Sequence, residues 1–431
     1  MVVGNFKDAL YCDGLVGVTG GNDPNAFISK IDNGGNCLWT KSIPCAGTSQ
    51  SFALDIDSSG NIFLSVEAST FALIDTNLIS PGGSIIKLDR SGNVLWIKQI
   101  INLHWSSPAL RIRDIKIKDD RIYLTGDASN TQVNLDTIQL NANGELGFII
   151  ASLDLSANAI WAKMYAKPNS KGGNNLSIDE HGNIYTVGTM YSSAHFDQDS
   201  LINSVYPNGY IAKFDSLGNY KWAHNLVSPI HGASVTACHV SEDGSTYFTG
   251  WFRNSISLNN CLAFGNGNDT TSFIARLDSG GNCLGVTSFG NAIGMSIVTL
   301  QDRSPVIVGQ FTQSTTVGGL TIQSLGSWDM FIGRLDILTD VTNLERRINK
   351  SLLIYANPSQ GKCTITVPDE LFNENNLTLN IFDHNGKLVQ QKNLVMHNGS
   401  IKVNLDQEAR GIYHVSLSNG EKTYNGKIVF E

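Results

Sequence analysis

The sequence predicts an all-β fold, in which a repeated four-stranded unit builds a β-propeller and a small β-sandwich follows it. Three observations predict this fold. A short apolar motif that ends in aspartate recurs six times, at Asp32, Asp89, Asp154, Asp215, Asp278 and Asp336. A tryptophan follows each of the first four aspartates by seven residues. The chain has 42 glycines and only 16% charged residues, which is typical of turn-rich β-proteins.

Each aspartate motif belongs to a predicted β-hairpin, and a second hairpin precedes it in the same repeat. In the second repeat, apolar residues alternate over 54–57 and 61–66, and again over 84–88 and 94–99. Asp, Gly and Asn fill the turns between these segments, as in strands joined by tight turns. Each repeat of about 60 residues therefore contains four strands, named A, B, C and D in chain order.

Four-stranded antiparallel units of this length are typical of propeller blades rather than of solenoid turns. The recurrent tryptophans Trp39, Trp96, Trp161 and Trp222 fall on strand D, and Gly285 takes this place in the fifth repeat. An indole on the outer strand can pack against the adjoining blade and remove about 150–250 Å² from water. We therefore predict that these four tryptophans dock neighbouring blades.

The strand count predicts a six-bladed ring that is truncated at its N-terminus. Strands B and C each occur six times, whereas strands A and D occur five times, because the chain begins at the B strand 2–6 and the last C strand runs into a linker. The closing D strand and the first A strand are expected upstream of Met1, together with a signal peptide. A seven-bladed ring is the alternative.

Charge and hydropathy exclude several partners. The net charge is −8, and the 30 Lys and Arg residues are scattered singly, so no nucleic acid is expected as a partner. No run of 18 apolar residues occurs, so no transmembrane segment is predicted. The first ten residues contain no charged leader followed by an apolar stretch, so no secretory signal is visible in them, and one is expected upstream.

The seven cysteines form an odd set without a C-x-x-C motif. Cys37 and Cys283 occupy the same repeat position, two residues before the tryptophan site, so we expect them to pack in separate repeats rather than to bond to each other. One or two disulfides remain open in an oxidising compartment, and the spacing assigns no pairing.

The repeat pattern stops after Asp336, which predicts a propeller domain at 1–338. Residues 339–351 are polar and are predicted to be a linker, and residues 352–431 contain about seven short strand patterns. Such a density of strands in 80 residues predicts a small sandwich of the immunoglobulin or fibronectin type.

Four ordered blocks of this C-terminal domain resemble the type A sorting domain of the type IX secretion system. They are Tyr355, Asn357, Pro358, Ser359 and Gly361; Ile381, Phe382, Asp383, Gly386, Lys387 and Val389; Gly411, Ile412 and Tyr413; and Lys427, Ile428 and Val429. Ala356 departs from the usual proline, and the chain ends in Phe430 and Glu431 rather than in a basic pair.

The resemblance of residues 352–431 to a sorting domain implies that the protein is secreted. Sorting domains of this kind direct a folded cargo through the type IX secretion machinery of Gram-negative bacteria. They are often removed near the linker as the cargo is released or attached to surface lipopolysaccharide. The repeats at about residues 2–336 are in turn similar to the seven-bladed-propeller-type (SBBP) repeats of bacterial secreted proteins, through blocks such as 182–188 and 213–222. That similarity implies an architecture and not an activity.

No catalytic, cofactor-binding or metal-binding residue is predicted. Aspartate-rich stretches such as 55–61 and 32–36 lack the glutamate that closes a calcium loop, so turn capping is the preferred interpretation. His224, His231, Cys238 and His239 form the only local group of soft ligands, but adjacent strand residues point to opposite faces. No nucleophile, nucleotide-binding or zinc-protease fingerprint occurs in a suitable context.

The leading hypothesis is a secreted or cell-surface propeller that binds an extracellular glycan or protein without catalysis. Its ligand is expected on the D-to-A and B-to-C loops, such as 104–108, 167–173 and 228–232, with Trp105 and His231 as candidate contacts. The alternative is an extracellular polysaccharide hydrolase or lyase, which would place two carboxylates about 5–10 Å apart in a cleft of the ring.

Overall fold

The computed structural model divides into two compact units, Met1–Leu338 and Thr339–Glu431. It describes residues 1–12, 15–19, 23–102, 110–128, 132–141, 147–166, 171–191, 193–196, 199–201, 206–229, 231–265, 267, 269–317, 320–335, 350–368, 371, 377–383, 387–395, 399–419 and 423–431. The elements named within these ranges, β1 to β42, are all strands. The all-β prediction is therefore confirmed.

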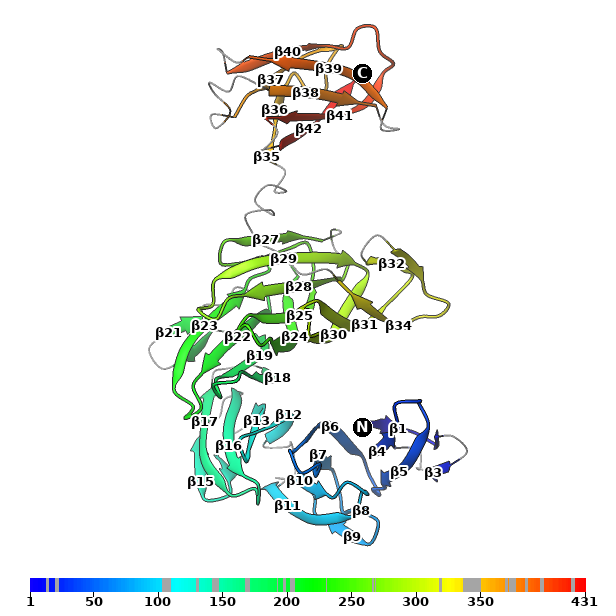
Figure 1. Ribbon diagram of the computed structural model, residues 1–431, viewed down its shortest axis with the longest axis vertical. Coiled ribbons are helices and arrows are strands. Elements are labelled where there is room, and N and C mark those ends of the chain that lie inside the picture. Colours follow the sequence, from blue (N-terminus) through cyan, green and yellow to red (C-terminus); the bar gives the residue numbers. More distant parts are fainter. Residues whose placement is uncertain are drawn as a thin grey trace. The chain divides into compact units, whose positions relative to one another are not determined.

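The first unit is a series of antiparallel sheets with the predicted strand order (Figure 1). In the second sheet, strands A to D are β6 (Ser49–Ile56), β7 (Ile62–Ala68), β10 (Gly82–Leu88) and β11 (Val94–Asn102). The next three sheets repeat this order with β12 (Leu110–Lys118), β13 (Arg121–Ala128), β16 (Gly147–Asp154) and β17 (Ala159–Ala166); β18 (Lys171–Ile178), β19 (Ile184–Met190), β22 (Asn208–Phe214) and β23 (Tyr220–Leu226); and β24 (Ala233–Val240), β25 (Thr246–Phe252), β28 (Thr271–Leu277) and β29 (Cys283–Gly290).

The first and the last sheet have three main strands each within the described residues. The first contains β1 (Val2–Phe6), β4 (Asn25–Ile31) and β5 (Cys37–Ile43), which correspond to strands B, C and D. The sixth contains β30 (Ala292–Thr299), β31 (Pro305–Phe311) and β34 (Asp329–Arg334), which correspond to strands A, B and C. The predicted strand count agrees with these sheets, while the number of blades in a closed ring stays a prediction.

Every repeat also contains a short two-stranded hairpin between strands B and C, which the sequence analysis missed. These hairpins are β2 (Ala9–Cys12) with β3 (Leu15–Thr19), β8 (Ala72–Ile74) with β9 (Asn77–Ile79), β14 (Gln132–Leu135) with β15 (Ile138–Asn141), β20 (Ala194–Phe196) with β21 (Asp199–Leu201), β26 (Ser255–Leu258) with β27 (Cys261–Phe264), and β32 (Ser314–Val317) with β33 (Leu320–Gln323). Their strands are too short to show a clear alternation of apolar residues.

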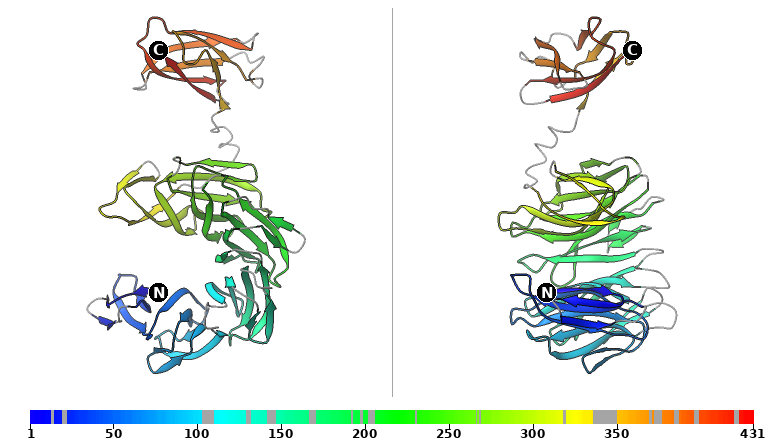
Figure 2. Two further views of the ribbon diagram at one scale, coloured as in Figure 1. Left: turned by 180° about the vertical axis from the view of Figure 1, so that it is seen from behind. Right: turned by 90° about the vertical axis from the view of Figure 1, so that its right-hand side faces the viewer.

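Neighbouring sheets pack face to face, and their A strands meet on the inner side of a curved path (Figures 1 and 2). Each apolar cluster is shared by two sheets. In one of them, Phe63 and Ile85 of the second sheet pack with Ile115 and Leu124 of the third. The core is thus a series of interlayers, as expected for a repeat whose unit cannot bury its own faces.

Two disulfides tie a short hairpin to strand D of the same repeat. Cys12 bonds to Cys37 in the first repeat, and Cys261 bonds to Cys283 in the fifth. Cys37 and Cys283 are therefore not bonded to each other, as predicted, but each forms a disulfide instead of packing as a free apolar residue. Because the hairpins were missed, the partner cysteines could not be placed.

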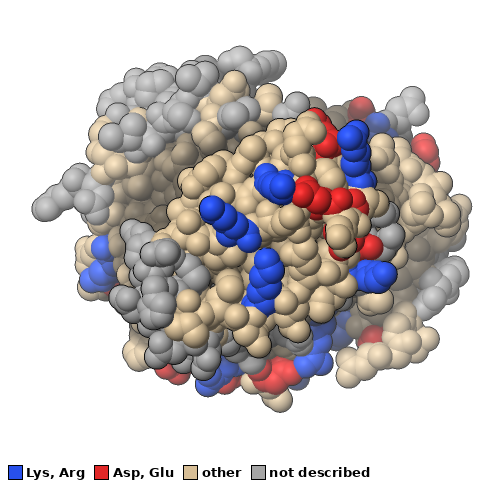
Figure 3. All heavy atoms as spheres, turned by 90° about the horizontal axis from the view of Figure 1, so that it is seen from above, with Lys and Arg blue, Asp and Glu red and all other residues tan. Residues whose placement is uncertain are grey.

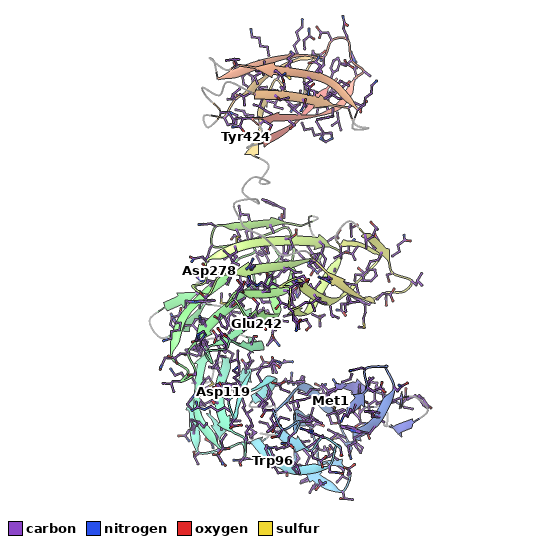
Figure 4. All side chains as sticks on the ribbon, in the orientation of Figure 1. Met1, Trp96, Asp119, Glu242, Asp278 and Tyr424 are labelled. Carbon is purple, nitrogen blue, oxygen red and sulfur yellow. A yellow bond between two sulfur atoms is a disulfide. The ribbon has the colours of Figure 1, made fainter. Side chains whose placement is uncertain are left out.

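The second unit is a two-layer β-sandwich. One sheet has the order β35 (Lys350–Ser351), β42 (Thr423–Phe430), β41 (Gly411–Ser418), β38 (Leu377–Phe382) and β39 (Leu388–Leu394), and the other has β36 (Leu353–Tyr355), β37 (Lys362–Thr366) and β40 (Ser400–Asn404). Ile365, Leu377, Ile381 and Tyr424 are almost fully buried between the sheets. Figure 4 labels Tyr424. The sandwich was predicted, with about seven strands where eight are described.

Candidate functional site

The four recurrent tryptophans lie half-buried on strand D, where each contacts the next sheet. The Trp161 indole Nε1 donates a hydrogen bond to the Ser216 carbonyl (3.3 Å), and a Cβ at Gly218 would lie 2.8 Å from the Trp161 ring. Trp39 approaches Gly92 and Trp222 approaches Gly281 in the same way, while Trp96 packs against the cluster that contains Ala157. The indole therefore covers the C-to-D turn of the following repeat.

These C-to-D turns are closed by their own aspartate. Asp215 Oδ1 accepts hydrogen bonds from the Leu217 and Asn219 amides (3.0 and 2.9 Å), and its Oδ2 accepts one from the Asn219 side chain (3.1 Å). Equivalent bonds close the turns that begin at Asp32, Asp89, Asp154 and Asp278, and the A-to-B turns at Asp57 and Asp179. The recurrent aspartates thus act as turn caps.

We expect acid to destabilise the repeat unit between about pH 4 and pH 2. Partial burial acts to raise the pKa of Asp215, but the hydrogen bonds from Asn219 and Lys221 outweigh it and lower the pKa to about 2. An unfolded aspartate has a pKa of about 3.9. A lowered native pKa gives stability that is present above the unfolded pKa and is lost as the pH falls through the native pKa. The pKa values of Asp32, Asp57, Asp89, Asp154 and Asp278 are lowered too.

The measurement is the urea midpoint from tryptophan fluorescence at pH 5, 4, 3 and 2. All seven tryptophans precede residue 339, so the fluorescence reports on the repeats alone. Asp215→Asn should show a smaller fall of the midpoint between pH 4 and 2 than the unchanged protein. A midpoint that stays constant down to pH 2 would contradict the role of the carboxylates.

A buried polar network connects the inner strands of the third, fourth and fifth sheets. Asp114 Oδ2 accepts hydrogen bonds from the Asn175 side chain (2.6 Å) and the Leu176 amide (2.9 Å), and Asn175 Oδ1 accepts one from the Cys238 amide (2.9 Å). The Lys116 ammonium lies 3.4 Å from Asp114 Oδ1. Strand A has no strand partner on its inner edge, so side chains of the preceding sheet satisfy its amides. This network was not predicted from the sequence.

The soft ligands named from the sequence do not form one site. The His224 ring lies 4.9 Å from the Trp222 ring, and burial lowers the pKa of His224. The buried Cys238 thiol donates to the Tyr185 carbonyl (3.6 Å), and burial lowers the pKa of His239 on the same strand. Within the described ranges, no three His, Cys, Asp or Glu side chains are grouped as metal ligands.

The predicted ligand loops lie only partly within the described chain. The loop 104–108 with Trp105 lies outside the described residues, and of the loop 167–173 the description begins at Lys171. His231, in the loop 228–232, is exposed and has a φ of 70°, and its ring lies 5.9 Å from the Tyr206 ring. His231 therefore lies at the D-to-A end of the sheets, and its part in ligand binding stays a prediction.

A depression of about 250 Å³ lies at this same end, between the fifth and the sixth sheet. Trp328, which is 51% exposed, lines it. The other lining residues are Arg253, Asp269, Thr270, Asn291, Ala292, Ile293, Thr312 and Gln313. This site was not predicted from the sequence. No tryptophan recurs at the position of Trp328 in the other repeats, and the polar residues around Trp328 come from separate loops.

A second depression lies at the opposite end, among the A-to-B and C-to-D turns of the fourth and fifth sheets. Its acidic residues are Asp179, Glu180, Glu242 and Asp243, of which Figure 4 labels Glu242. Asp179 caps its own turn, and Asp243 contacts the Arg276 and Arg303 guanidinium groups at 3.2 and 3.5 Å. Burial acts to raise the pKa of Asp243, but its hydrogen bonds and Arg276 outweigh this and lower it, whereas a general acid needs a raised pKa.

In the C-terminal unit, Asn357 fastens the first turn to the last strand. Its Oδ1 accepts a hydrogen bond from the Val429 amide (2.8 Å), and its Nδ2 donates to the Lys427 carbonyl (2.6 Å). Gly361 has a φ of 92°, and a Cβ there would lie 2.3 Å from an Asp406 oxygen. Asn357 therefore holds the first turn against the last strand, and Gly361 allows a backbone conformation and a close approach that other residues would not tolerate.

The remaining motif residues are distributed over the sandwich. Asp383 and Lys387 close a turn through two hydrogen bonds of 2.9 Å, and Gly386 between them lies outside the described residues. Tyr413 is buried, and its hydroxyl donates to the Ala409 carbonyl. Gly411 begins β41, whereas Tyr355, Pro358 and Lys427 are exposed at the surface.

On the face shown in Figure 3, lysine and arginine side chains are scattered, with uncharged surface and some acidic side chains between them. In the part of the chain that the structure describes, no helix has the length and apolar character to cross a bilayer.

Comparisons with known proteins identify the C-terminal unit. Residues 353–431 match the family described as the secretion system C-terminal sorting domain. No curated protein matches the chain. Among solved structures, the chain is similar to the Dos1 propeller, with 12% identity, 70% of this chain and 76% of that chain covered, and a TM-score of 0.37.

Two further solved structures are similar at comparable levels. A member of the DUF4221 family from Bacteroides vulgatus has 12% identity, with 67% of this chain and 84% of that chain covered and a TM-score of 0.33. A glycoside hydrolase of family 32 from Bifidobacterium adolescentis has 9% identity, with 100% and 95% covered and a TM-score of 0.27. At these scores the likenesses carry no argument about function. The chain thus contains a C-terminal sorting domain of the type IX secretion system at residues 353–431, which follows the propeller-type sheets in the sequence and directs the protein to secretion.

Proposed function

We propose that this protein is an exported binding module, in which the repeat unit holds an extracellular ligand without catalysis. The observation that carries the proposal is the depression at the D-to-A end of the fifth and sixth sheets, where an exposed indole lies among uncharged and charged hydrogen-bonding groups. Loops presented by a rigid β-scaffold are a usual place for ligand sites. The sorting domain supplies the route to the cell exterior.

The location follows from the tail. Export through the type IX machinery would place the protein outside a Gram-negative cell, either released or attached to surface lipopolysaccharide. Removal of the sorting domain near residues 339–351 would leave the repeat unit as the mature part. The two disulfides suit this environment, because disulfides persist in oxidising compartments.

The competing function is a polysaccharide hydrolase or lyase. The acidic depression among the turns is the place where it would act. Its two most buried carboxylates already interact with groups of the protein, because Asp179 caps a turn and Asp243 forms ion pairs with two arginines. Glu180 and Glu242 are the two exposed glutamates that line this depression, and a glycosidase needs two carboxyl groups. The lowered pKa of Asp243 opposes a role for this carboxyl as the general acid.

Two experiments test the proposal. Cells that carry the natural gene should export the protein, and deletion of 353–431 should keep it inside the cell envelope, as measured by fractionation. The purified full chain is then applied to arrays of extracellular glycans and proteins, and glycans are assayed for new reducing ends. We expect binding without release of sugars. Release that is lost in Glu242→Gln would establish the hydrolase instead.

A further inference from the structure

The depression between the fifth and the sixth sheet has the composition of a carbohydrate site. We propose that it binds one sugar ring of an extracellular glycan, with the ring stacked on Trp328 and its hydroxyls bonded to Asp269, Asn291, Gln313 and Arg253. This inference rests on the binding function proposed above and assigns it a place and a ligand class.

The aromatic wall is the first argument. Trp328 lies in the loop between β33 and β34, and about half of its surface is exposed, unlike the fully covered aromatic rings of the core. It also differs from the four recurrent tryptophans, because it occupies no repeat position. An indole offers a flat apolar face, against which the C–H groups of a sugar ring can pack. A tryptophan exposed beside polar groups is therefore suited to a ligand that is apolar on one face and polar at its rim.

The polar rim is the second argument. Asp269 and Arg253 are exposed, and neither forms an ion pair with another described residue. The two oxygens of a carboxylate accept hydrogen bonds, a guanidinium donates several in a fixed fork, and side-chain amides do both. The Asn291 Nδ2 donates one hydrogen bond to the Ser314 carbonyl (3.2 Å), so Asn291 offers the ligand its Oδ1 acceptor. Vicinal hydroxyls of a sugar present both donors and acceptors, so the rim complements them better than it complements an apolar side chain.

The third argument is the fixed backbone of the walls. Asn291 and Gln313 have φ values of 53° and 57°, in the left-handed region. They are held there because the Thr312 amide donates to the Asn291 carbonyl (3.2 Å) and the Ser324 amide donates to the Gln313 carbonyl (2.6 Å). The Leu325 amide in turn donates to Asp329 Oδ2 (2.7 Å), which fastens the loop that carries Trp328. The site is thus formed before any ligand arrives, which lowers the entropic cost of binding.

The volume of the depression favours a single sugar ring over a larger ligand. The volume of about 250 Å³ lies below the range of about 300–1,000 Å³ that is usual for drug-sized ligands. It accommodates a monosaccharide unit, and its open side lets the rest of a chain leave along the surface. A protein partner would need a wider apolar contact than this polar depression offers.

The test uses the full chain on an array of neutral hexose, pentose and uronate oligosaccharides, followed by titration of the best-bound member. Trp328→Ala is expected to weaken binding at least tenfold, Asp269→Asn several-fold, and Trp328→Phe less than Trp328→Ala. Met330→Ala is the matched control, because Met330 is 80% exposed on the next strand and does not line the depression. Unchanged urea midpoints will show that the variants are folded.

The outcomes separate this inference from the function on which it rests. Glycan binding that is unchanged in Trp328→Ala, or weakened equally in Met330→Ala, overturns the site and leaves the binding function standing. Binding to proteins but to no glycan overturns the ligand class alone. If the unchanged chain binds neither glycans nor proteins, both the inference and the proposed function fail.

Discussion

Replacement of Ile274 by alanine is expected to lower the free energy of unfolding of the repeat unit by about 2–5 kcal/mol, whereas the same replacement at Ile332 changes it by no more than about 0.5 kcal/mol. Both isoleucines lie on strand C, two residues before the arginine of the Arg-Leu-Asp motif. The backbone and the neighbouring sequence are therefore closely matched.

The difference arises from what covers each side chain. Ile274 is fully buried in a cluster with Ile297 and Ile307 of the following sheet. Ile332 is 76% exposed. The equivalent isoleucines of the first four sheets, Ile28, Ile85, Ile150 and Ile211, are buried as well. Removal of a buried isoleucine loses its transfer free energy and leaves a cavity, whereas an exposed one loses neither.

Urea denaturation followed by tryptophan fluorescence measures both changes on the full chain. The control is Met330→Ala, which lies on the same exposed face as Ile332 and should also be close to neutral. A loss above about 1.5 kcal/mol in Ile332→Ala would contradict the exposed face and would show that another sheet covers it in solution.

The repeat was accessible to sequence reasoning because its signals are local. The aspartate, glycine and asparagine of one turn lie within five residues, and the tryptophan follows at a fixed distance, so the pattern can be read from any single repeat. The same holds for the sorting motif, in which Asn357 and Gly361 lie in one turn. Physical constraints that act over a few residues leave a readable pattern.

The features that were missed depend on contacts between repeats. In the sequence, Asp114 looks like an ordinary polar residue of a strand. It belongs to a buried network because Asn175 of the next sheet donates a hydrogen bond to it. Trp328 becomes a candidate ligand contact only when loops from two sheets meet around it. The partner of Cys37 was hidden because strand Ala9–Cys12 is too short to recognise. No single segment contains these relations.

Replacement of Asp114 by alanine is expected to lower the free energy of unfolding by about 3–5 kcal/mol. Asp114 is 5% exposed, and alanine would leave the Asn175 side chain and the Leu176 amide without an acceptor. It would also leave the Lys116 ammonium without its nearest carboxylate. Burial raises the pKa of the Asp114 carboxyl, although Lys116 and the hydrogen bonds oppose this rise. Asp114→Asn keeps one acceptor oxygen and should cost about 1–3 kcal/mol.

The fold itself supplies the control for this substitution. Ala53 in the second sheet and Ala237 in the fifth occupy the position of Asp114, since they pair with Ser65 and Thr249 as Asp114 pairs with Thr125. Alanine is therefore compatible with the strand at this place, and a loss at 114 reports the missing acceptor rather than a strained backbone. Glu242→Ala, on the surface, should change the urea midpoint little. A loss below about 1 kcal/mol in Asp114→Ala would mean that water replaces the carboxylate and that the inner strands are held together without it.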